Sequence, residues 1–204
     1  MSAQEYMKML TEEFHSAAVA TIGNDGKPQI RIIDMMLYDE KGVYFLTAKG
    51  KDFYGQLMEQ SFVAVSSTKD KTSISLRGKI RNIGHEKLDE IFEKNTYMKG
   101  IYPGDTRQIL EVFCIYEAAG EYFDISDPSH VIRDGFVIGG AEKEMSGYFI
   151  GAGCIGCKLC YSVCSQKCID ISRKPAVIEQ NRCLHCGRCA QICPKQIIEK
   201  IGGQ

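Results

Sequence analysis

The chain of 204 residues contains no run of about 18 apolar residues, so we expect no helix that spans a membrane. Its N-terminus, MSAQEYMKMLTEEF, carries charges throughout and lacks the apolar centre of a secretory signal peptide. The formal net charge of −1 provides no overall attraction to nucleic acid. We therefore expect a cytoplasmic protein that binds neither membranes nor nucleic acid.

Cysteine is nearly absent from residues 1–150, where only Cys114 occurs, whereas the other nine of the ten cysteines follow. Charge divides at the same place, because residues 1–150 hold 17 Lys/Arg and 23 Asp/Glu and residues 151–204 hold 8 and 3. The two parts therefore have net charges of −6 and +5. These two shifts predict a first domain at 1–126, a linker at 127–146 and a second domain at 147–204.

The second part contains two cysteine runs, CIGCKLCYSVC at 154–164 and CLHCGRCAQIC at 183–193. Both have the spacing C-x2-C-x2-C-x3-C, and the second repeats the first at an offset of 29 residues. In a reducing cytosol, such cysteines favour metal binding over disulfides. Structural zinc is the alternative, but zinc sites usually combine two separated C-x2-C pairs. The successive short spacings favour iron–sulfur clusters, because three thiolates of one run can reach three irons.

Residues 147–201 resemble the bacterial two-cluster ferredoxins, with YFI and AVI before the two runs as short strands. The resemblance implies two [4Fe–4S] clusters, with the fourth cysteine of each run bound to the other cluster. One cluster would take Cys154, Cys157, Cys160 and Cys193, and the other would take Cys183, Cys186, Cys189 and Cys164. Ser165 replaces a proline of the family that shapes a turn and is not a ligand. We interpret Cys168 as a buried free thiol and expect no ligand role for His185.

The first part predicts a mainly β domain interrupted by helices. Apolar periodicity predicts helices at 3–15, 51–60 and 85–98. Alternating and β-branched segments predict strands at 17–22, 28–38, 42–48, 61–67, 72–83, 109–118 and 120–126. A mostly antiparallel sheet of about six or seven strands with interspersed helices is typical of a barrel.

The segment RIIDMMLYDEKGVYFLTAKGKDFYGQL at 31–57 resembles the flavin-binding segment of the pyridoxamine 5′-phosphate oxidase-like split barrels. The resemblance spans about residues 10–126. It implies a split β-barrel that binds FMN, and a homodimer with FMN in the cleft between protomers. The predicted fold class is therefore mainly β with helices, joined to a small α+β ferredoxin domain with two-fold pseudo-symmetry.

The FMN phosphate favours cations and backbone N–H groups at the start of a helix. Lys49 and Lys51 lie beside the start of the second predicted helix, and Arg31 lies on a neighbouring strand. The residues alone favour solvated surface positions for these three, whereas the resemblance favours phosphate binding for Arg31 and Lys51. The resemblance also implies flavin contacts from Ile32, Ile33, Asp34, Thr47 and Ala48, with Gln56 and Arg77 as further candidates.

Asp52 and Phe53 stand where the vitamin-processing oxidases carry an Arg-Lys pair, and the cysteine-rich part replaces their C-terminal substrate segment. An oxidase that passes electrons to oxygen has no use for clusters, so we do not expect that activity. We predict an oxidoreductase that passes electrons between the clusters and FMN to reduce a small oxidised molecule, such as a nitroaromatic, quinone, enone or flavin. Its electrons would come from a partner of ferredoxin or flavodoxin type. The alternatives are a non-catalytic electron relay and a redox or flavin sensor.

No catalytic residue follows from the sequence. His15, His85 and His130 have no nearby partners in sequence, and we interpret them as structural or exposed. Tyr97 and Tyr102 are candidates for a substrate pocket but are more typical of an aromatic core. The opposite charges of the two parts predict that they associate electrostatically, and a flexible tether is the alternative.

Overall fold

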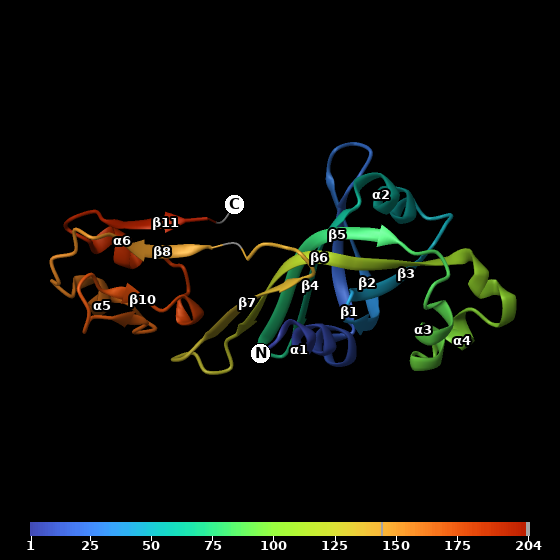
Figure 1. Cartoon of the computed structure of the whole chain (residues 1–204), viewed down its shortest axis with the longest axis horizontal. Helices are drawn as coiled ribbons and strands as arrows, with labels where there is room; N and C mark the ends of the chain where they lie inside the picture. The colour runs from blue at the N-terminus through green and yellow to red at the C-terminus, as the bar shows by residue number, and fades with distance from the viewer. Residues whose placement is uncertain (144, 203–204) are drawn as a thin grey trace. The chain divides into compact units, whose positions relative to one another are not determined.

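The structure is a computed structural model that describes residues 1–143 and 145–202. It divides into two compact units. Unit 1 comprises Met1–Tyr122 and Gly135–Glu142, and unit 2 comprises Phe123–Asp134 and Lys143–Gln204 (Figure 1). Within the described ranges, no helix has both the length and the apolar character that a membrane crossing needs.

The N-terminal helix begins with a capping box. In α1 (Ala3–Lys8), the hydroxyl of Ser2 accepts a hydrogen bond from the Glu5 amide, while the Glu5 carboxylate accepts one from the Ser2 amide. The helix continues as the π-helical η1 (Met9–Phe14), so the predicted helix at 3–15 changes its hydrogen-bonding pattern midway. It ends at His15, whose φ of 62° and ψ of −65° are uncommon for a residue other than glycine.

Six antiparallel strands of unit 1 close into a barrel, which confirms the predicted fold class. The sheet order is β3-β2-β1-β4-β5-β6, and β3 also pairs with β6 to close the ring. The strands are β1 (Ser16–Ile22), β2 (Pro28–Asp39), β3 (Gly42–Ala48), β4 (Phe62–Lys69), β5 (Thr72–Asn82) and β6 (Leu110–Asp124). The remaining helices of this unit are α2 (Asp52–Gln60), α3 (Leu88–Lys94), α4 (Met98–Ile101) and η2 (Gly104–Ile109).

Strand β3 separates two hydrophobic cores, which explains why all seven of its residues are buried. Phe45 and its neighbours of the same parity face the barrel interior, where Tyr6 of α1 and Leu57 of α2 also pack. Residues of the other parity, such as Leu46, pack with Ile91 of α3 in the second core. The strand therefore shows a continuous apolar pattern in place of alternation.

Strand β7 (Ile132–Ile138) lies inside the stretch expected to be a linker, and it joins the sheet beside β6. The two strands expected at 109–118 and 120–126 also form one continuous strand, β6. The expected break between them fell at Ala119, directly before Gly120. A Cβ atom on Gly120 would lie 2.4 Å from Cζ of Phe136, so this glycine makes room for an aromatic ring of β7 and does not end the strand.

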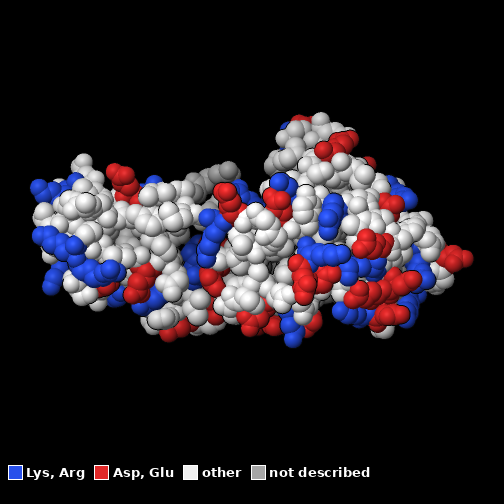
Figure 2. Space-filling model, viewed as in Figure 1, with Lys and Arg blue, Asp and Glu red and all other residues white. Residues whose placement is uncertain are grey.

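Unit 2 repeats a strand, a cysteine run and a short helix. Strand β8 (Gly147–Ile150) pairs with β11 (Ile198–Ile201), and β9 (Ile169–Asp170) pairs with β10 (Val177–Ile178). The helices of the two halves are α5 (Leu159–Val163) and α6 (Arg188–Ile192), with the short η3 (Gln180–Arg182) before the second run. The strands predicted at 148–150 and 176–178 are confirmed as β8 and β10. Lys and Arg side chains gather on this unit in Figure 2.

The segment before β7 is held inside unit 2 by Gln166, a side chain that is only 5% exposed. Its Oε1 accepts a hydrogen bond of 3.1 Å from the Val131 amide, and its Nε2 donates one of 2.8 Å to the Pro128 carbonyl. Both polar groups of a buried amide are thus satisfied by residues that lie more than thirty positions earlier in the sequence.

Candidate functional site

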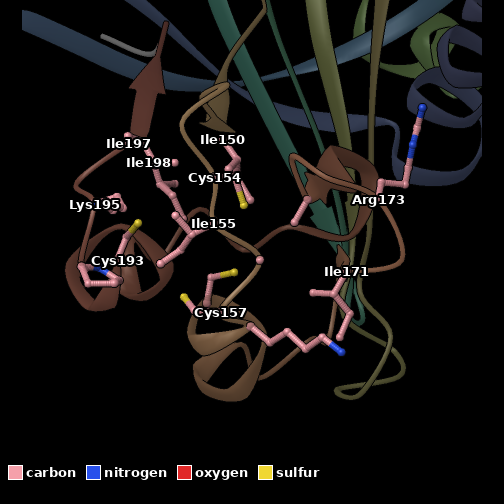
Figure 3. A pocket seen from close by; sticks show the side chains of 15 residues that line it. Ile150, Cys154, Ile155, Cys157, Ile171, Arg173, Cys193, Lys195, Ile197 and Ile198 are labelled. Atoms are coloured by element: carbon pink, nitrogen blue, oxygen red, sulfur yellow. The ribbon is translucent and has the colours of Figure 1, made fainter.

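The cysteines of the two runs line two separate cavities in unit 2. The first cavity is lined by Cys154, Cys157 and Cys160 of the first run together with Cys193 of the second. Figure 3 shows the sulfur atoms of Cys154, Cys157 and Cys193 around the same space, which these residues approach from separate segments. Isoleucine side chains, among them Ile198, form much of the remaining wall. Four thiols around an apolar cavity are a donor set that fits a thiolate-bound cluster.

The second cavity has the complementary set. It is lined by Cys183, Cys186 and Cys189 of the second run and by Cys164 of the first. Across residues 1–143 and 145–202, no three His, Cys, Asp or Glu side chains converge closely enough to hold a single metal ion. The thiols are instead spread around the two cavities, four at each, and the grouping is the one that the ferredoxin resemblance implies.

Cys168 is a fifth thiol at the second cavity. It is buried, as interpreted from the sequence, and its sulfur lies 3.6 Å from the sulfur of Cys164. A hydrogen bond with Cys168 lowers the pKa of the Cys183 thiol, whereas the same bond and burial raise the pKa of Cys168. Cys168 therefore keeps its proton while Cys183 more readily becomes a thiolate, the form that binds metal.

In unit 1, Arg31 lies where α2 covers the barrel. Its guanidinium donates hydrogen bonds of 2.5 Å to Thr21 Oγ1 and 3.0 Å to Gln56 Oε1, and it lies 4.3 Å from the centre of the Phe53 ring. None of its partners among the described residues is a carboxylate. Burial lowers the pKa of Arg31, because a cation is poorly solvated there. A half-buried guanidinium without a counter-ion fits an anionic ligand.

Lys51 is the N-cap residue of α2, exposed and with no ion pair in the described part of the chain. The first amides of a helix have no intrahelical acceptor, and Phe53, on which Arg31 stacks, belongs to the first turn of α2. Arg31 and Lys51 are thus both positioned at the start of α2, where cations and helix amides suit a phosphate. Lys49 differs, because its ammonium is paired with Glu111 at 2.7 Å.

The candidates on β2 and β3 have distinct environments. Thr47 is 2% exposed, and its hydroxyl makes no hydrogen bond within the residues that the structure describes. A buried hydroxyl without a partner is a candidate for a hydrogen bond with a bound ligand. Ala48 is buried next to it, Ile33 packs partly on the barrel core, and Ile32 is 68% exposed on the outer face of β2.

Gln56 and Arg77 occupy different parts of unit 1. Gln56 is buried, and its carbonyl accepts from Thr21 and Arg31 while its amide donates to Gln29. It therefore orients Arg31 from inside the protein. Arg77 lies opposite Ala64 on β5, three strands from β2 in the sheet order. Arg77 shares the sheet face of Ile30 through the pairs Arg77–Ala64, Ala64–Ala20 and Ala20–Ile30. Arg31, the next residue along β2, faces the other side of the sheet, so Arg31 and Arg77 do not converge within one protomer.

Asp34 is at the centre of a cluster that sequence reasoning missed. Its carboxylate accepts hydrogen bonds of 2.6 Å from Ser16 and 2.8 Å from Tyr97, and His15 Nε2 lies 3.5 Å away. His15 Nε2 is also 2.9 Å from the Tyr97 hydroxyl. Burial acts to raise the pKa of Asp34, but the hydrogen bonds from Ser16 and Tyr97 and the interaction with His15 lower it overall. Only the flavin resemblance singled out Asp34, and no local pattern links these residues.

A cavity of about 380 Å³ lies beside this cluster and is lined by His15. Its other walls come from η1, β2 and the end of α3, including Met36, Lys94 and Asn95. The volume lies within the range of about 300–1,000 Å³ that is typical of small-molecule sites. His15 also has a φ of 62°, a strained conformation for a residue other than glycine, and such strain is common at functional sites.

Both parts of the chain match known families. Residues 3–117 match the family described as pyridoxamine 5′-phosphate oxidase, and residues 153–197 match the 4Fe-4S dicluster domain. A segment of 47 residues is 45% identical to one of the subunits of the ion-translocating oxidoreductase complex of Methanosarcina acetivorans. That segment covers 23% of this chain and only 18% of that relative.

Solved structures resemble the barrel. A NimC/NimA family protein from Clostridium acetobutylicum has a TM-score of 0.57 and 18% identity, over 68% of this chain and 95% of its own. A pyridoxinephosphate oxidase family protein related to a general stress protein, also from Clostridium acetobutylicum, has a TM-score of 0.51 and 18% identity, over 65% and 94%. At such identities the likeness shows the fold alone.

The first family match covers more than half of the chain, and its fold is the one that the six-stranded barrel shows. The second match covers both cysteine runs. The chain thus belongs to the pyridoxamine 5′-phosphate oxidase family of FMN-binding split barrels and carries in addition a ferredoxin-type 4Fe-4S dicluster domain.

Proposed function

We propose that this protein is a cytoplasmic FMN- and iron–sulfur-dependent oxidoreductase that reduces a small oxidised molecule, such as a nitroaromatic, quinone, enone or flavin. One observation carries the proposal. Eight thiols, grouped four and four, share a chain with a cationic site at the start of α2 that has no counter-ion among the described residues. The first arrangement suits one-electron carriers and the second suits a flavin phosphate.

Arg31 and Lys51 hold the FMN phosphate, and Gln56 fixes Arg31 in place through a 3.0 Å hydrogen bond. Thr47 offers its unpaired hydroxyl to the cofactor, and Ala48 lies beside it on the same strand. When bound, FMN exchanges electrons one at a time with iron–sulfur clusters and delivers two to an organic substrate. Lys49 contributes less, because Glu111 already neutralises it.

The cysteines of unit 2 hold two [4Fe–4S] clusters, one at each cavity, with a ligand exchanged between the two runs. Cys193 completes the set at the first cavity, and Cys164 completes the set at the second. Residues 151–204 have a formal charge of +5, which two clusters, each about −2 with its four thiolates, would reduce to about +1. The electron donor that we propose for this module is a protein of ferredoxin or flavodoxin type.

The substrate enters the cavity that His15 lines. The His15 ring is hydrogen-bonded to the Tyr97 hydroxyl, which in turn donates to Asp34. Two-electron reduction of a quinone, enone or nitro group consumes protons, and this chain of groups supplies them. A cavity of about 380 Å³ with adjacent proton donors favours an enzyme over a relay, because a relay needs neither.

A homodimer completes the flavin site. Ile30 and Ile32 on the outer face of β2 are 71% and 68% exposed, and their neighbours on β1 are the small residues Ala20 and Ala18. Large exposed isoleucines on the outer face of the sheet favour burial against a second copy. Arg77 lies on this same outer face, through the pairs Ile30–Ala20 and Ala64–Arg77, and would reach the partner's flavin.

Anaerobic purification followed by cofactor analysis and a screen with reduced ferredoxin tests the proposal. We expect bound FMN, iron and acid-labile sulfide, and ferredoxin oxidation that depends on an added nitroaromatic, quinone, enone or flavin. Oxidation that depends only on a protein acceptor would favour the relay. Absence of flavin after purification, together with failure to bind added FMN, would contradict the proposal.

A further inference from the structure

The repeat in unit 2 allows the two cavities to be compared position by position. The runs are offset by 29 residues, so Cys164 corresponds to Cys193 and Cys168 corresponds to Ile197. Cys168 lines the second cavity, and Ile197 lines the first. The two cavities therefore share a set of four thiols but differ at one matched position, where one has a fifth thiol and the other has a hydrocarbon.

The fifth thiol is placed to act on its neighbours. The Cys168 sulfur lies 3.6 Å from the Cys164 sulfur, within the range of a hydrogen bond between sulfur atoms, and Cys168 is 2% exposed. Cys183, another member of the second thiol set, is its other hydrogen-bonding partner. Both contacts of Cys168 thus fall on the set at the second cavity. Ile197 has no proton to donate at the first.

Hydrogen bonds to the sulfur ligands of a cluster influence its reduction potential. A donor stabilises the more negative, reduced state more than the oxidised state, and so it raises the potential. The influence is strongest for a bond that is shielded from water, since the interior is less polar than solvent. Cys168 satisfies this condition, because the Cys168 side chain is almost wholly buried.

We propose that Cys168 is a tuning residue for the cluster at the second cavity. Its thiol donates a hydrogen bond to a cysteine ligand, and this raises the reduction potential of that cluster above the potential of the other. An electron shared by the pair then resides mainly at the second cavity. The inference rests on the proposed binding of two [4Fe–4S] clusters.

The test uses the full chain, loaded anaerobically, as wild type and as Cys168→Ala, Cys168→Ser and Ile197→Cys. Iron and acid-labile sulfide are measured first, and each variant should match the wild type. A redox titration followed by electron paramagnetic resonance then gives the two reduction steps. Cys168→Ala should lower the equilibrium constant for reduction in one of the two steps by about threefold to tenfold. A tenfold change corresponds to about 59 mV in the reduction potential of a one-electron step.

The other variants separate tuning from a structural role. Cys168→Ser keeps a hydrogen-bond donor and should stay closer to the wild type than Cys168→Ala. Ile197→Cys adds a donor at the first cavity and should raise the other step. Unchanged potentials in Cys168→Ala, or equal shifts of both steps, would overturn the inference. Loss of iron from Cys168→Ala would also overturn it and make Cys168 a ligand.

The iron analysis also distinguishes failure of this inference from failure of the proposed function. If the wild-type protein contains zinc and no sulfide, it binds no iron–sulfur clusters, and the inference about Cys168 is refuted as well. Wild-type protein with full clusters and no FMN would refute the oxidoreductase proposal, yet the two reduction steps and their response to Cys168→Ala would remain measurable.

Discussion

The hydroxyl of Tyr97 donates a 2.8 Å hydrogen bond to the carboxylate of Asp34, across 63 positions of sequence. This bond joins the segment after α3 to the strand that carries Arg31 and Ile32. Burial and the bond to Asp34 raise the pKa of Tyr97, so the phenol stays protonated at neutral pH. The pair therefore holds a proton at a fixed place beside the cavity that His15 lines.

Tyr97→Phe removes a hydrogen bond that helps to lower the pKa of Asp34, so this pKa should rise. The acidic limb of the pH profile of substrate reduction should move to higher pH, and the maximal rate should fall about tenfold or more. FMN affinity should remain. Steady-state rates between about pH 4 and pH 8 check this. Tyr102→Phe is the matched control and should leave the profile in place.

Arg31→Ala and Lys51→Ala each remove a charge-assisted contact with the FMN phosphate, worth roughly 1.5–3 kcal/mol. FMN affinity should fall about tenfold or more, while riboflavin, which lacks the phosphate, should bind nearly as before. Fluorescence titration with both flavins measures this. Lys49→Ala is the control, because its ammonium is paired with Glu111, and its effect should be smaller. Equal losses for FMN and riboflavin would mean that these residues support the fold.

The cysteine assignment predicts about eight irons and about eight acid-labile sulfides per chain. Because the fourth ligand of each run serves the other cavity, Cys193→Ser should disturb the cluster bound by Cys154, and Cys164→Ser the one bound by Cys183. Each variant should retain about half of the iron. Absorbance near about 400 nm that bleaches with dithionite supports the assignment. Two zinc ions without sulfide would contradict it.

The exposed isoleucines of β2 predict the effect of charge on assembly. Ile30→Lys and Ile32→Lys place ammonium groups on the proposed two-fold interface, where burial of unpaired charge is unfavourable. The protein should become monomeric, and it should bind FMN less well because the second protomer no longer completes the flavin site. Light scattering and flavin absorbance measure both. Ile125→Lys, at an isoleucine that is 44% exposed in unit 2, should remain dimeric. A wild-type monomer with FMN fully bound would refute the dimer.

Glu111 predicts a pH-dependent contribution to stability. Hydrogen bonds from Lys49 and Tyr54 lower its pKa to about 2, against the effect of burial. The contribution should be complete above the ordinary carboxyl pKa of about 4.3 and be lost as the pH falls toward 2. Glu111→Gln should therefore lower the urea midpoint of unit 1 at pH 7 and have a smaller effect near pH 3. Glu117→Gln removes a single ion pair with Lys79 and should be milder.

The sequence predicts most of the fold because its local signals agree with it. The strands at 17–22 and 42–48 correspond to β1 and β3, and the cysteine spacing by itself separates the eight thiols into two runs. The predicted division of this stretch into two strands at Ala119 was wrong, because β6 continues through Ala119 and Gly120, where the glycine makes room for Phe136. Strand β7 was missed because its residues alternate weakly between exposed and buried positions.

The candidate sites divide in a similar way. Arg31 and Lys51 could be proposed because the flavin-binding segment resembles that of the split barrels, whereas their position beside a predicted helix alone favoured solvated surface residues. The ion pair of Lys49 with Glu111 and the cluster of His15, Tyr97 and Asp34 could not, since each depends on the closure of the barrel. Contacts that join residues so far apart in sequence leave no local periodicity to detect.

The chain crosses between the two units three times, because Phe123–Asp134 belongs to unit 2 while Gly135–Glu142 returns to unit 1. A protease that cuts once after Glu142 would therefore leave Val131 and Pro128 on the N-terminal fragment, still bound by Gln166 of the C-terminal fragment. The nicked protein should migrate as one species until a denaturant is added. For the same reason, the redox module cannot be transplanted at a single splice point, and a functional graft must carry the loop from Phe123 onward.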